Sequence, residues 1–196
     1  MAWAANLAAL EIHAPMARSV DIETPTMLVY DLDPGPGTTI IECCQIALVV
    51  RDLLDTVGLD SFPKTSGSKG LQVYVPLNTP HTHGHAASFA RATGRLIERD
   101  LPDRVTTTMA KAKRVDRIFI DWSQNSRHKT TVAPYSLRAR SEPMVSTPVD
   151  WGEVAECADG MPLLFAAGDV LERVAERGDL FEPTLTFEQR LPAPRG

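Results

Sequence analysis

The chain has 196 residues, of which 43% are apolar and 23% charged, proportions typical of a soluble globular domain with one core. No apolar run is long enough to cross a bilayer, and the start MAWAANLAALEIH lacks the basic segment and cleavage site of a signal peptide. The net charge of −5 argues against nucleic acid. However, the stretch from Lys111 to Arg140 is locally basic, with Asp116 and Asp121 as its only acids.

Hydrophobic periodicity and break signals predict the elements in chain order. A helix is expected over residues 2–13, and a strand over Met27–Asp33 that the following PGPG ends. Thr39 and Glu42 have the spacing of a capping box, so a helix should run from there to about Val57, with Gly58 as its stop. Further strands are expected over Leu71–Leu77, Arg117–Trp122 and Thr131–Ala139, and further helices over 84–100, 150–156 and 167–177. This mixture without strict alternation indicates the α+β class.

The cysteines Cys43, Cys44 and Cys157 are odd in number, and two of them are adjacent. This pattern argues against a disulfide framework. Small core residues in a reducing cytoplasm are therefore expected.

Three aspartates at strand ends are the first functional signal. Asp31 and Asp33 are alternate residues of one predicted strand, so their side chains should point to the same side, just before a turn. Asp121 ends a second apolar strand, and three such carboxylates can meet and hold divalent cations. Two bound ions could activate an attacking hydroxyl and stabilise a leaving pyrophosphate. The alternative is a solvated turn capped by aspartate, with Asp121 paired to a nearby arginine.

The second signal is the segment Lys64-Thr65-Ser66-Gly67-Ser68-Lys69-Gly70. Its glycines let backbone N–H groups approach an anion, its hydroxyls can donate hydrogen bonds, and its lysines supply charge. The order GxxxxGK[ST] is absent and a strand follows, so the segment is not a Walker A loop. A phosphate-binding loop is predicted, with a flexible surface turn as the alternative.

Two further groups of residues have weaker signals. Arg114 and Arg138 lie in the basic stretch, and the forked guanidinium suits phosphate, although a solvated face would look the same. His81, His83 and His85 form HTHGH, which could suggest zinc. No cysteine or second histidine group stands at metal-site spacing, so a loop is favoured over a metal site.

Six segments occur together in a characteristic order: NLAALEIH (6–13), LVYDLDPGPG (28–37), FPKTSGSKGLQVYVPL (62–77), AKAKRVDRIFIDWSQNSRHKTTVAPYSLRAR (110–140), VSTPVDW (145–151) and GDLFEP (178–183). In this order they resemble the polymerase domain of bacterial ligase D, a member of the archaeo-eukaryotic primase superfamily. The resemblance covers nearly the whole chain. It implies a primase-polymerase-like core, with a mixed or antiparallel sheet and flanking helices.

The resemblance also implies roles for individual residues. Asp31, Asp33 and Asp121 match the metal-binding acids of the family, which would hold two Mn²⁺ or Mg²⁺ ions. The residues that match its nucleotide-binding set are His13, Lys64, Ser66, Gly67, Lys69, Arg114 and Arg138. His13 has no signal of its own in the sequence, and only the resemblance singles it out.

The implied activity is template-directed addition of NTP or dNTP to a DNA primer or broken end, in end-joining repair of double-strand breaks. The implied partners are DNA ends, nucleotides, Ku and an ATP-dependent DNA ligase, in a cytoplasmic, nucleoid-associated setting without a membrane. A metal-dependent phosphohydrolase would use the same acids.

The sequence departs from the family pattern in two places. Gln72 stands where the motif SGxKGxH has histidine, and glutamine can form hydrogen bonds but cannot take up a proton. The family domain also has a portion before NLAALEIH, so residues 1–196 are interpreted as one shortened catalytic domain. Both departures favour the alternative function, a catalytically weak paralogue that binds nucleic acid or docks a partner.

Overall fold

The computed structural model describes residues 7 and 9–193, and a five-stranded sheet with the strand order β5-β6-β4-β8-β7 forms its centre. The strands are β4 (Met27–Pro34), β5 (Phe62–Thr65), β6 (Leu71–Pro76), β7 (Val105–Thr106) and β8 (Ile118–Asp121). β7 and β8 run parallel, and the other neighbours are antiparallel. The sheet is therefore mixed, and the predicted α+β class is confirmed.

Two short antiparallel ribbons lie outside this sheet. One pairs β1 (His13–Pro15) with β9 (Thr130–Val132), and the other pairs β2 (Ala17–Arg18) with β3 (Asp21–Pro25). The first ribbon joins two segments that are far apart in the sequence, because His13 lies opposite Val132.

The helices are α2 (Ile40–Asp55), α3 (His83–Asp100), α4 (Trp151–Ala158) and α5 (Ala167–Arg177), with 3-10 turns η1 (Lys111–Lys113), η2 (Trp122–Asn125) and η3 (Glu182–Leu185). The predicted capping box of α2 is present: the Thr39 side chain accepts from the Ile41 N–H, and Glu42 accepts from the Thr39 N–H at 2.7 Å. It satisfies donors that the first turn would otherwise leave unpaired. None of the described helices is long and apolar enough to span a membrane.

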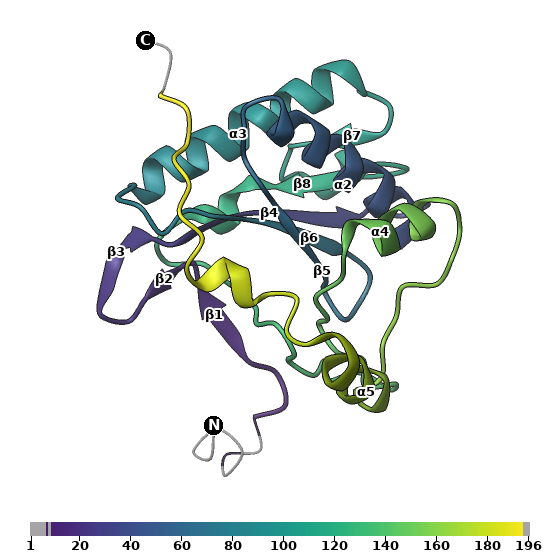
Figure 1. Cartoon of the computed structure of the whole chain (residues 1–196). Helices are drawn as coiled ribbons and strands as arrows, with labels where there is room; N and C mark the ends of the chain where they lie inside the picture. The colour runs from purple at the N-terminus through teal and green to yellow at the C-terminus, as the bar shows by residue number, and fades with distance from the viewer. Residues whose placement is uncertain (1–6, 8, 194–196) are drawn as a thin grey trace.

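The two faces of the central sheet have different environments. Figure 1 shows α2 and α3 on one side of the sheet and β1 on the other. On β4, Leu28, Tyr30 and Leu32 belong to the main core, which α2, α3 and α4 complete. Val29, on the other face, joins a small cluster with Met16, Tyr74 and Phe181. We call the face that carries Leu28, Tyr30 and Leu32 the helix face, and the face that carries Val29 the open face.

The structure corrects two predicted elements. Residues 2–6 and 8 of the predicted helix 2–13 lie outside the described residues; residues 9–12 have no regular structure, and His13 begins a strand. Residues 131–139 are extended only as far as Val132, because Pro134 has no N–H for a ladder and Tyr135 turns the backbone with φ 64°.

Candidate active site

A row of polar residues crosses four strands of the sheet. In the register, Lys64 on β5 lies opposite Gln72 on β6, Gln72 opposite Asp31 on β4, and Asp31 opposite Asp121 on β8. Residues directly opposite each other in antiparallel strands project to the same face. All four side chains therefore project from the open face, as does Asp33, two residues after Asp31.

A cavity of about 430 Å³ opens over this row. Two of the predicted acids line it, together with predicted members of the nucleotide-binding set. The lining residues are His13, Asp31, Asp33, Pro34, Ser66, Ser68, Lys69, Gly70, Gln72, Arg114, Gln124, Thr130, Thr131, Val132, Arg138 and Arg140. The structure thus brings seven predicted site residues to one cavity, whereas Lys64, Gly67 and Asp121 do not line it.

The two lining carboxylates are held under mutual repulsion. Burial, followed by the charge of Asp33, raises the pKa of Asp31 to about 7. Burial, followed by the charge of Asp121, also raises the pKa of Asp33. Each shift shows that the ionised form is unfavourable here, and a bound cation would relieve that cost.

The Asp121 carboxylate is turned toward η2. One oxygen accepts from the Ser123 N–H at 2.9 Å and the Ser123 hydroxyl at 2.6 Å, and the other accepts from Gln124 Nε2 at 2.9 Å. Among the residues that the structure describes, no group of three His, Cys, Asp or Glu is arranged to hold a metal ion. Asp31 and Asp33 thus fit a hard divalent cation, whereas Asp121 would have to turn from η2 to join them.

The loop after β5 forms a closed turn at the rim of the cavity. The Ser66 N–H donates to the Gly70 carbonyl at 2.9 Å, and the Ser66 hydroxyl accepts from the Gly70 N–H at 3.1 Å. Gly67 has φ +66°, and a Cβ there would lie 2.7 Å from the Ser146 nitrogen. Glycine thus lets the turn lie against its neighbouring backbone, and Lys69 faces the cavity from this turn.

Lys64 lies beneath the cavity rather than at its rim. Its side chain is fully buried in β5, not in the flexible loop that the sequence suggested. The ammonium donates to the Ser146 hydroxyl at 2.6 Å and lies 5.6 Å from the centre of the Tyr74 ring. Burial lowers its pKa to about 7, against the opposing effect of Asp31. When protonated, Lys64 can therefore favour the ionised form of Asp31 electrostatically, without contacting a ligand in the cavity.

Two arginines bring positive charge to the cavity wall. The Arg114 guanidinium lies 3.6 Å from the centre of the Phe119 ring and donates to the Met109 carbonyl at 2.8 Å. Arg138 donates to the Ser66 carbonyl at 3.4 Å and pairs with Glu11 at 3.5 Å. These contacts orient both side chains, so they form a fixed set of donors rather than a mobile surface charge.

The backbone that carries Arg114 touches the turn that follows Asp33. The Gly35 N–H donates to the Arg117 carbonyl at 3.0 Å. A Cβ on Gly35 would lie only 1.6 Å from the Arg114 carbonyl oxygen, so the close approach requires glycine.

The histidines of HTHGH make structural contacts. His81 Nε2 accepts from the Leu191 N–H at 3.1 Å, and His85 Nε2 lies 3.2 Å from the Pro192 carbonyl oxygen. These contacts fasten the C-terminal segment to the start of α3. The predicted loop is wrong for His83 and His85, which lie in the first turn of α3, whereas His81 precedes the helix.

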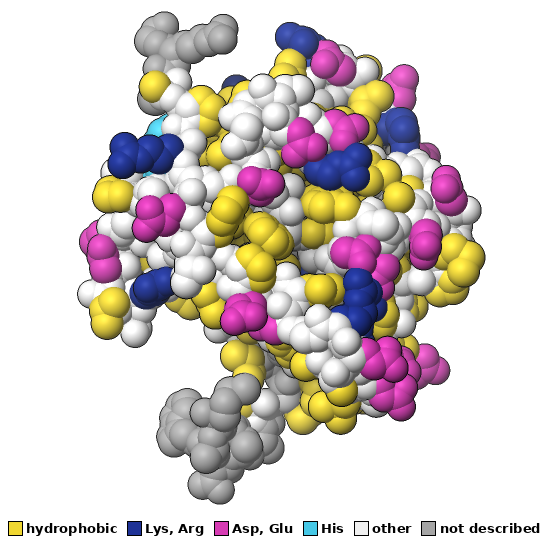
Figure 2. Space-filling view, viewed as in Figure 1, with side chains coloured by type: hydrophobic (Ala, Val, Ile, Leu, Met, Phe, Trp, Pro, Cys, Tyr) yellow, Lys and Arg dark blue, Asp and Glu magenta, His cyan; other side chains and the backbone are white. Residues whose placement is uncertain are grey.

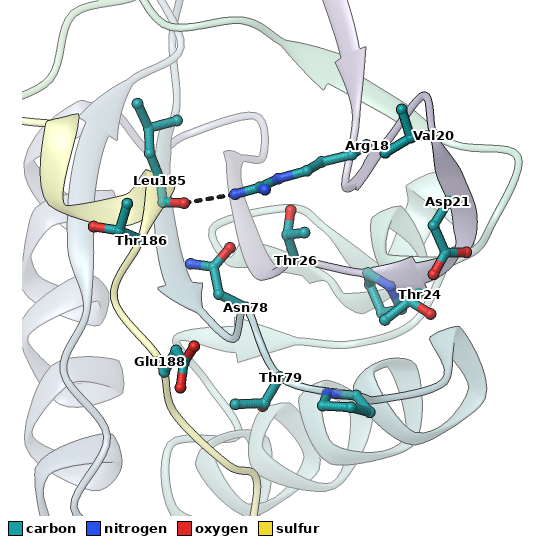
Figure 3. A pocket seen from close by; sticks show the side chains of 12 residues that line it. Arg18, Val20, Asp21, Thr24, Thr26, Asn78, Thr79, Leu185, Thr186 and Glu188 are labelled. Carbon is teal, nitrogen blue, oxygen red and sulfur yellow. Dashed lines mark hydrogen bonds between the residues drawn. The ribbon is translucent and has the colours of Figure 1, made fainter.

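A second cavity, of about 450 Å³, lies between the β2–β3 ribbon and the segment after η3 (Figure 3). Arg18 extends along it and donates to the Leu185 carbonyl at 2.7 Å. Asp21 and Glu188 line the same space. None of the predicted site residues lies there, so the cavity over the polar row is the candidate active site.

Residues 1–181 match the family described as "LigD, primase-polymerase domain". The chain is 44% identical over 185 residues to the Multifunctional non-homologous end joining protein LigD of Mycolicibacterium smegmatis, covering 93% of this chain and 24% of that protein. It is 31% identical over 177 residues to the Bifunctional non-homologous end joining protein LigD of Bacillus subtilis, covering 90% and 28%. The chain thus spans about a quarter of the length of these relatives.

The fold is similar to a solved structure, the polymerase domain from Mycobacterium tuberculosis Ligase D in complex with DNA. The TM-score is 0.86 with 42% sequence identity, covering 93% of this chain and 66% of that chain. The family match and the fold therefore define the class as a primase-polymerase domain, which belongs to the nucleotidyltransferases. The chain belongs to the LigD primase-polymerase domain family, as the resemblance predicted.

Proposed function

We propose that this chain adds nucleotides, as NTP or dNTP, to the 3′-hydroxyl of a DNA primer or broken end. One observation carries the proposal: within a single cavity, the paired carboxylates Asp31 and Asp33 face the cations Lys69, Arg114 and Arg138. Phosphoryl transfer needs this combination, since the acids hold metal and the cations bind the triphosphate.

Asp31 and Asp33 would hold the divalent cation, Mn²⁺ or Mg²⁺, with Asp121 as a further ligand once it turns from η2. When bound, metal ions supply activation of the attacking hydroxyl and charge stabilisation for the leaving pyrophosphate.

The residues of the chain position the nucleotide. The Ser66–Gly70 turn, Lys69 and Arg138, which contacts Ser66, hold the triphosphate together, and Arg114 neutralises its charge from another part of the cavity wall. His13, on the β1–β9 ribbon, donates to the nucleotide from the third side of the cavity. Its side chain is 42% exposed and its Nε2 lies 3.3 Å from Glu11 Oε2, so binding a nucleotide through this nitrogen would require that contact to open. Lys64, buried on the same face of the sheet, supports this set without lining the cavity, and Gly67 gives the turn its shape.

The relatives supply the biological setting. They are named for non-homologous end joining, and the similar solved structure is in complex with DNA. We propose the same setting here: double-strand-break repair in the cytoplasm, at the nucleoid, with Ku and an ATP-dependent DNA ligase as partners. The side of the molecule seen in Figure 2 carries Lys and Arg side chains dispersed among acidic and apolar ones, without a single basic patch. We propose that DNA approaches by the cavity, whose lining includes Lys69, Arg114, Arg138 and Arg140.

The test is primer extension with a labelled dNTP and Mn²⁺ on a gapped DNA, with release of pyrophosphate followed in parallel. The expected result is label in DNA and one pyrophosphate per nucleotide added, both abolished by EDTA. Asp33→Asn should abolish the reaction, whereas the matched change Asp52→Asn, on exposed α2 surface, should not. Free phosphate in place of pyrophosphate would indicate a phosphohydrolase. DNA binding with neither product would indicate the catalytically weak paralogue.

A further inference from the structure

Gln72 makes two hydrogen bonds in the floor of the cavity, one buried and one partly buried. Its amide nitrogen donates to Asp31 Oδ1 at 2.9 Å, and its amide oxygen accepts from the Tyr74 hydroxyl at 3.1 Å. Tyr74 in turn lies 2.8 Å from the Thr131 hydroxyl. Gln72, Tyr74 and Thr131 are each less than 5% exposed. The two bonds of Tyr74 are therefore shielded from water, whereas the bond to Asp31 is only partly buried, at the cavity.

The direction of this chain of bonds follows from counting protons. A phenol has a single proton, and Tyr74 gives it to the Gln72 amide oxygen. The Thr131 hydroxyl must then be the donor to Tyr74. We call this series of hydrogen bonds, in which Thr131 donates to Tyr74, Tyr74 to Gln72 and Gln72 to Asp31, the relay. Because every donor in it is defined, the Gln72 amide can have only one orientation. Such aligned bonds strengthen one another in a buried setting.

The relay has a consequence for the metal ligand. Among the hydrogen bonds of the described residues, that from Gln72 is the one that reaches the Asp31 carboxylate. It occupies Oδ1 and leaves Oδ2 without a protein donor. Because the amide is neutral, it orients the carboxylate without cancelling its charge, whereas a cationic donor would compete with a metal ion for it.

We propose that Gln72 is a positioning residue, which fixes Asp31 so that its second oxygen is presented to the divalent cation. The relay anchors this orientation on Thr131 of β9, the strand that pairs with β1 and its His13. The metal side and the nucleotide side of the cavity are thereby joined through hydrogen bonds. This inference rests on the proposed function for the presence of a metal ion, but it concerns the residue that holds the ligand.

The experiment measures Mn²⁺ binding directly, from the loss of the free-ion EPR signal on titration of the whole chain, without nucleotide or DNA. Gln72→Leu keeps the volume and removes the donor, and we expect 10- to 100-fold weaker binding, the usual effect of losing a ligand's hydrogen-bond partner. Asp31→Asn should lose the site. Gln45→Leu is the matched control, because Gln45 donates to the Ala158 carbonyl on the helix face, away from the cavity. This variant should bind Mn²⁺ as the parent does.

Two more variants separate positioning from general damage to the fold. Tyr74→Phe removes only the hydroxyl that locks the amide; it leaves two buried partners unpaired, so the thermal transition should fall, and Mn²⁺ binding, measured where the variant is fully folded, should weaken by less than in Gln72→Leu. Gln72→His restores a ring N–H donor and should recover most of the affinity that Gln72→Leu loses. If Gln72→Leu does not fold, Tyr74→Phe and Gln72→His still decide the matter.

The outcomes distinguish this inference from the proposed function. Folded Gln72→Leu and Tyr74→Phe variants that bind Mn²⁺ like the parent would overturn the role of Gln72, whatever the chain does with DNA. A parent that binds Mn²⁺ in a Gln72-dependent manner but adds no nucleotide would retain the role and remove the proposed reaction. A parent that binds no Mn²⁺ would remove both.

Discussion

Two carboxylates on opposite sides of the central sheet have pKa values that are shifted in opposite directions. Beside the helix face, hydrogen bonds from Thr39 lower the pKa of Glu42, and the pair caps α2. On the open face, burial and neighbouring acids raise the pKa of Asp31 to about 7. The first carboxylate is satisfied within the protein and stabilises it. The ionised form of the second is unfavourable, as expected of the metal-binding role that we propose for it.

Neighbouring residues on β4 give the sharpest test of this contrast, because alternate side chains serve different faces. Asp31→Ala should reduce nucleotide addition about a thousandfold or more, equivalent to about 4 kcal/mol of transition-state stabilisation. The measurement is primer extension, with circular dichroism to check that the fold is kept. Full activity in a folded variant would remove Asp31 from the site.

Leu32→Ala, one residue further on, should have the reverse effect. Leu32 is fully buried in the main core, so its loss should lower the free energy of unfolding by about 3 kcal/mol. The activity per folded molecule should remain, as urea titration combined with primer extension would show. A loss of activity greater than the loss of folded protein would mean that the two faces are not independent.

The pH dependence of stability should also differ between the faces. The folded pKa of Asp31, about 7, lies above its ordinary value of 3.8, so ionisation of Asp31 destabilises the fold as the pH rises between these values. In EDTA, Asp31→Asn should therefore stabilise the chain by about 2 kcal/mol at pH 8, with no gain near pH 4.

Glu42→Gln provides the opposite sign in the same measurement. Its folded pKa is lowered, so its contribution is present above the ordinary pKa of glutamate and lost as the pH falls below it. The variant should be less stable than the parent at pH 8, with the difference vanishing in acid. Thermal unfolding from pH 4 to pH 8 would check both variants, and equal signs would contradict the contrast.

The smallest effect is expected at the rim of the cavity. Lys69→Ala should weaken nucleotide binding about tenfold, about 1.4 kcal/mol, and DNA binding much less, because Lys69 faces the cavity from the Ser66–Gly70 turn. Fluorescence titrations with a nucleotide and with a DNA duplex would compare the two. Lys113→Ala, outside the cavity lining, is the matched control. Equal losses for both ligands would assign Lys69 to general electrostatics.

Local patterns were sufficient to predict much of this arrangement. Alternation along β4 predicted that Asp31 and Asp33 share a face, and the capping box predicted the start of α2. The register that sets Asp31 opposite Asp121 depends on strand pairing, which single-sequence patterns do not define.

Tertiary packing decided the features that the sequence did not predict. The sequence pattern suggested that Lys64 is a loop cation, but it is a buried residue of a strand. A charged residue type does not by itself indicate burial, which depends on tertiary packing. Gln72 was visible as a departure, but Tyr74 and Thr131, its hydrogen-bonded neighbours, were recognisable only in three dimensions. Gln124 and Arg140 line the cavity without any motif of their own.

The contact at Gly35 works as a spacer for the whole site. The strand that ends with the acids and the segment that bears Arg114 are separated there by the thickness of two bare backbones. The distance between the strand that bears the aspartates and the segment that bears Arg114 thus depends on a contact between two main chains. One added methyl group at Gly35 would push the strand and the segment apart, and we expect it to misalign the triphosphate that we propose to bind between them. The width of the cavity thus depends on Gly35, a residue that has no side chain to line it.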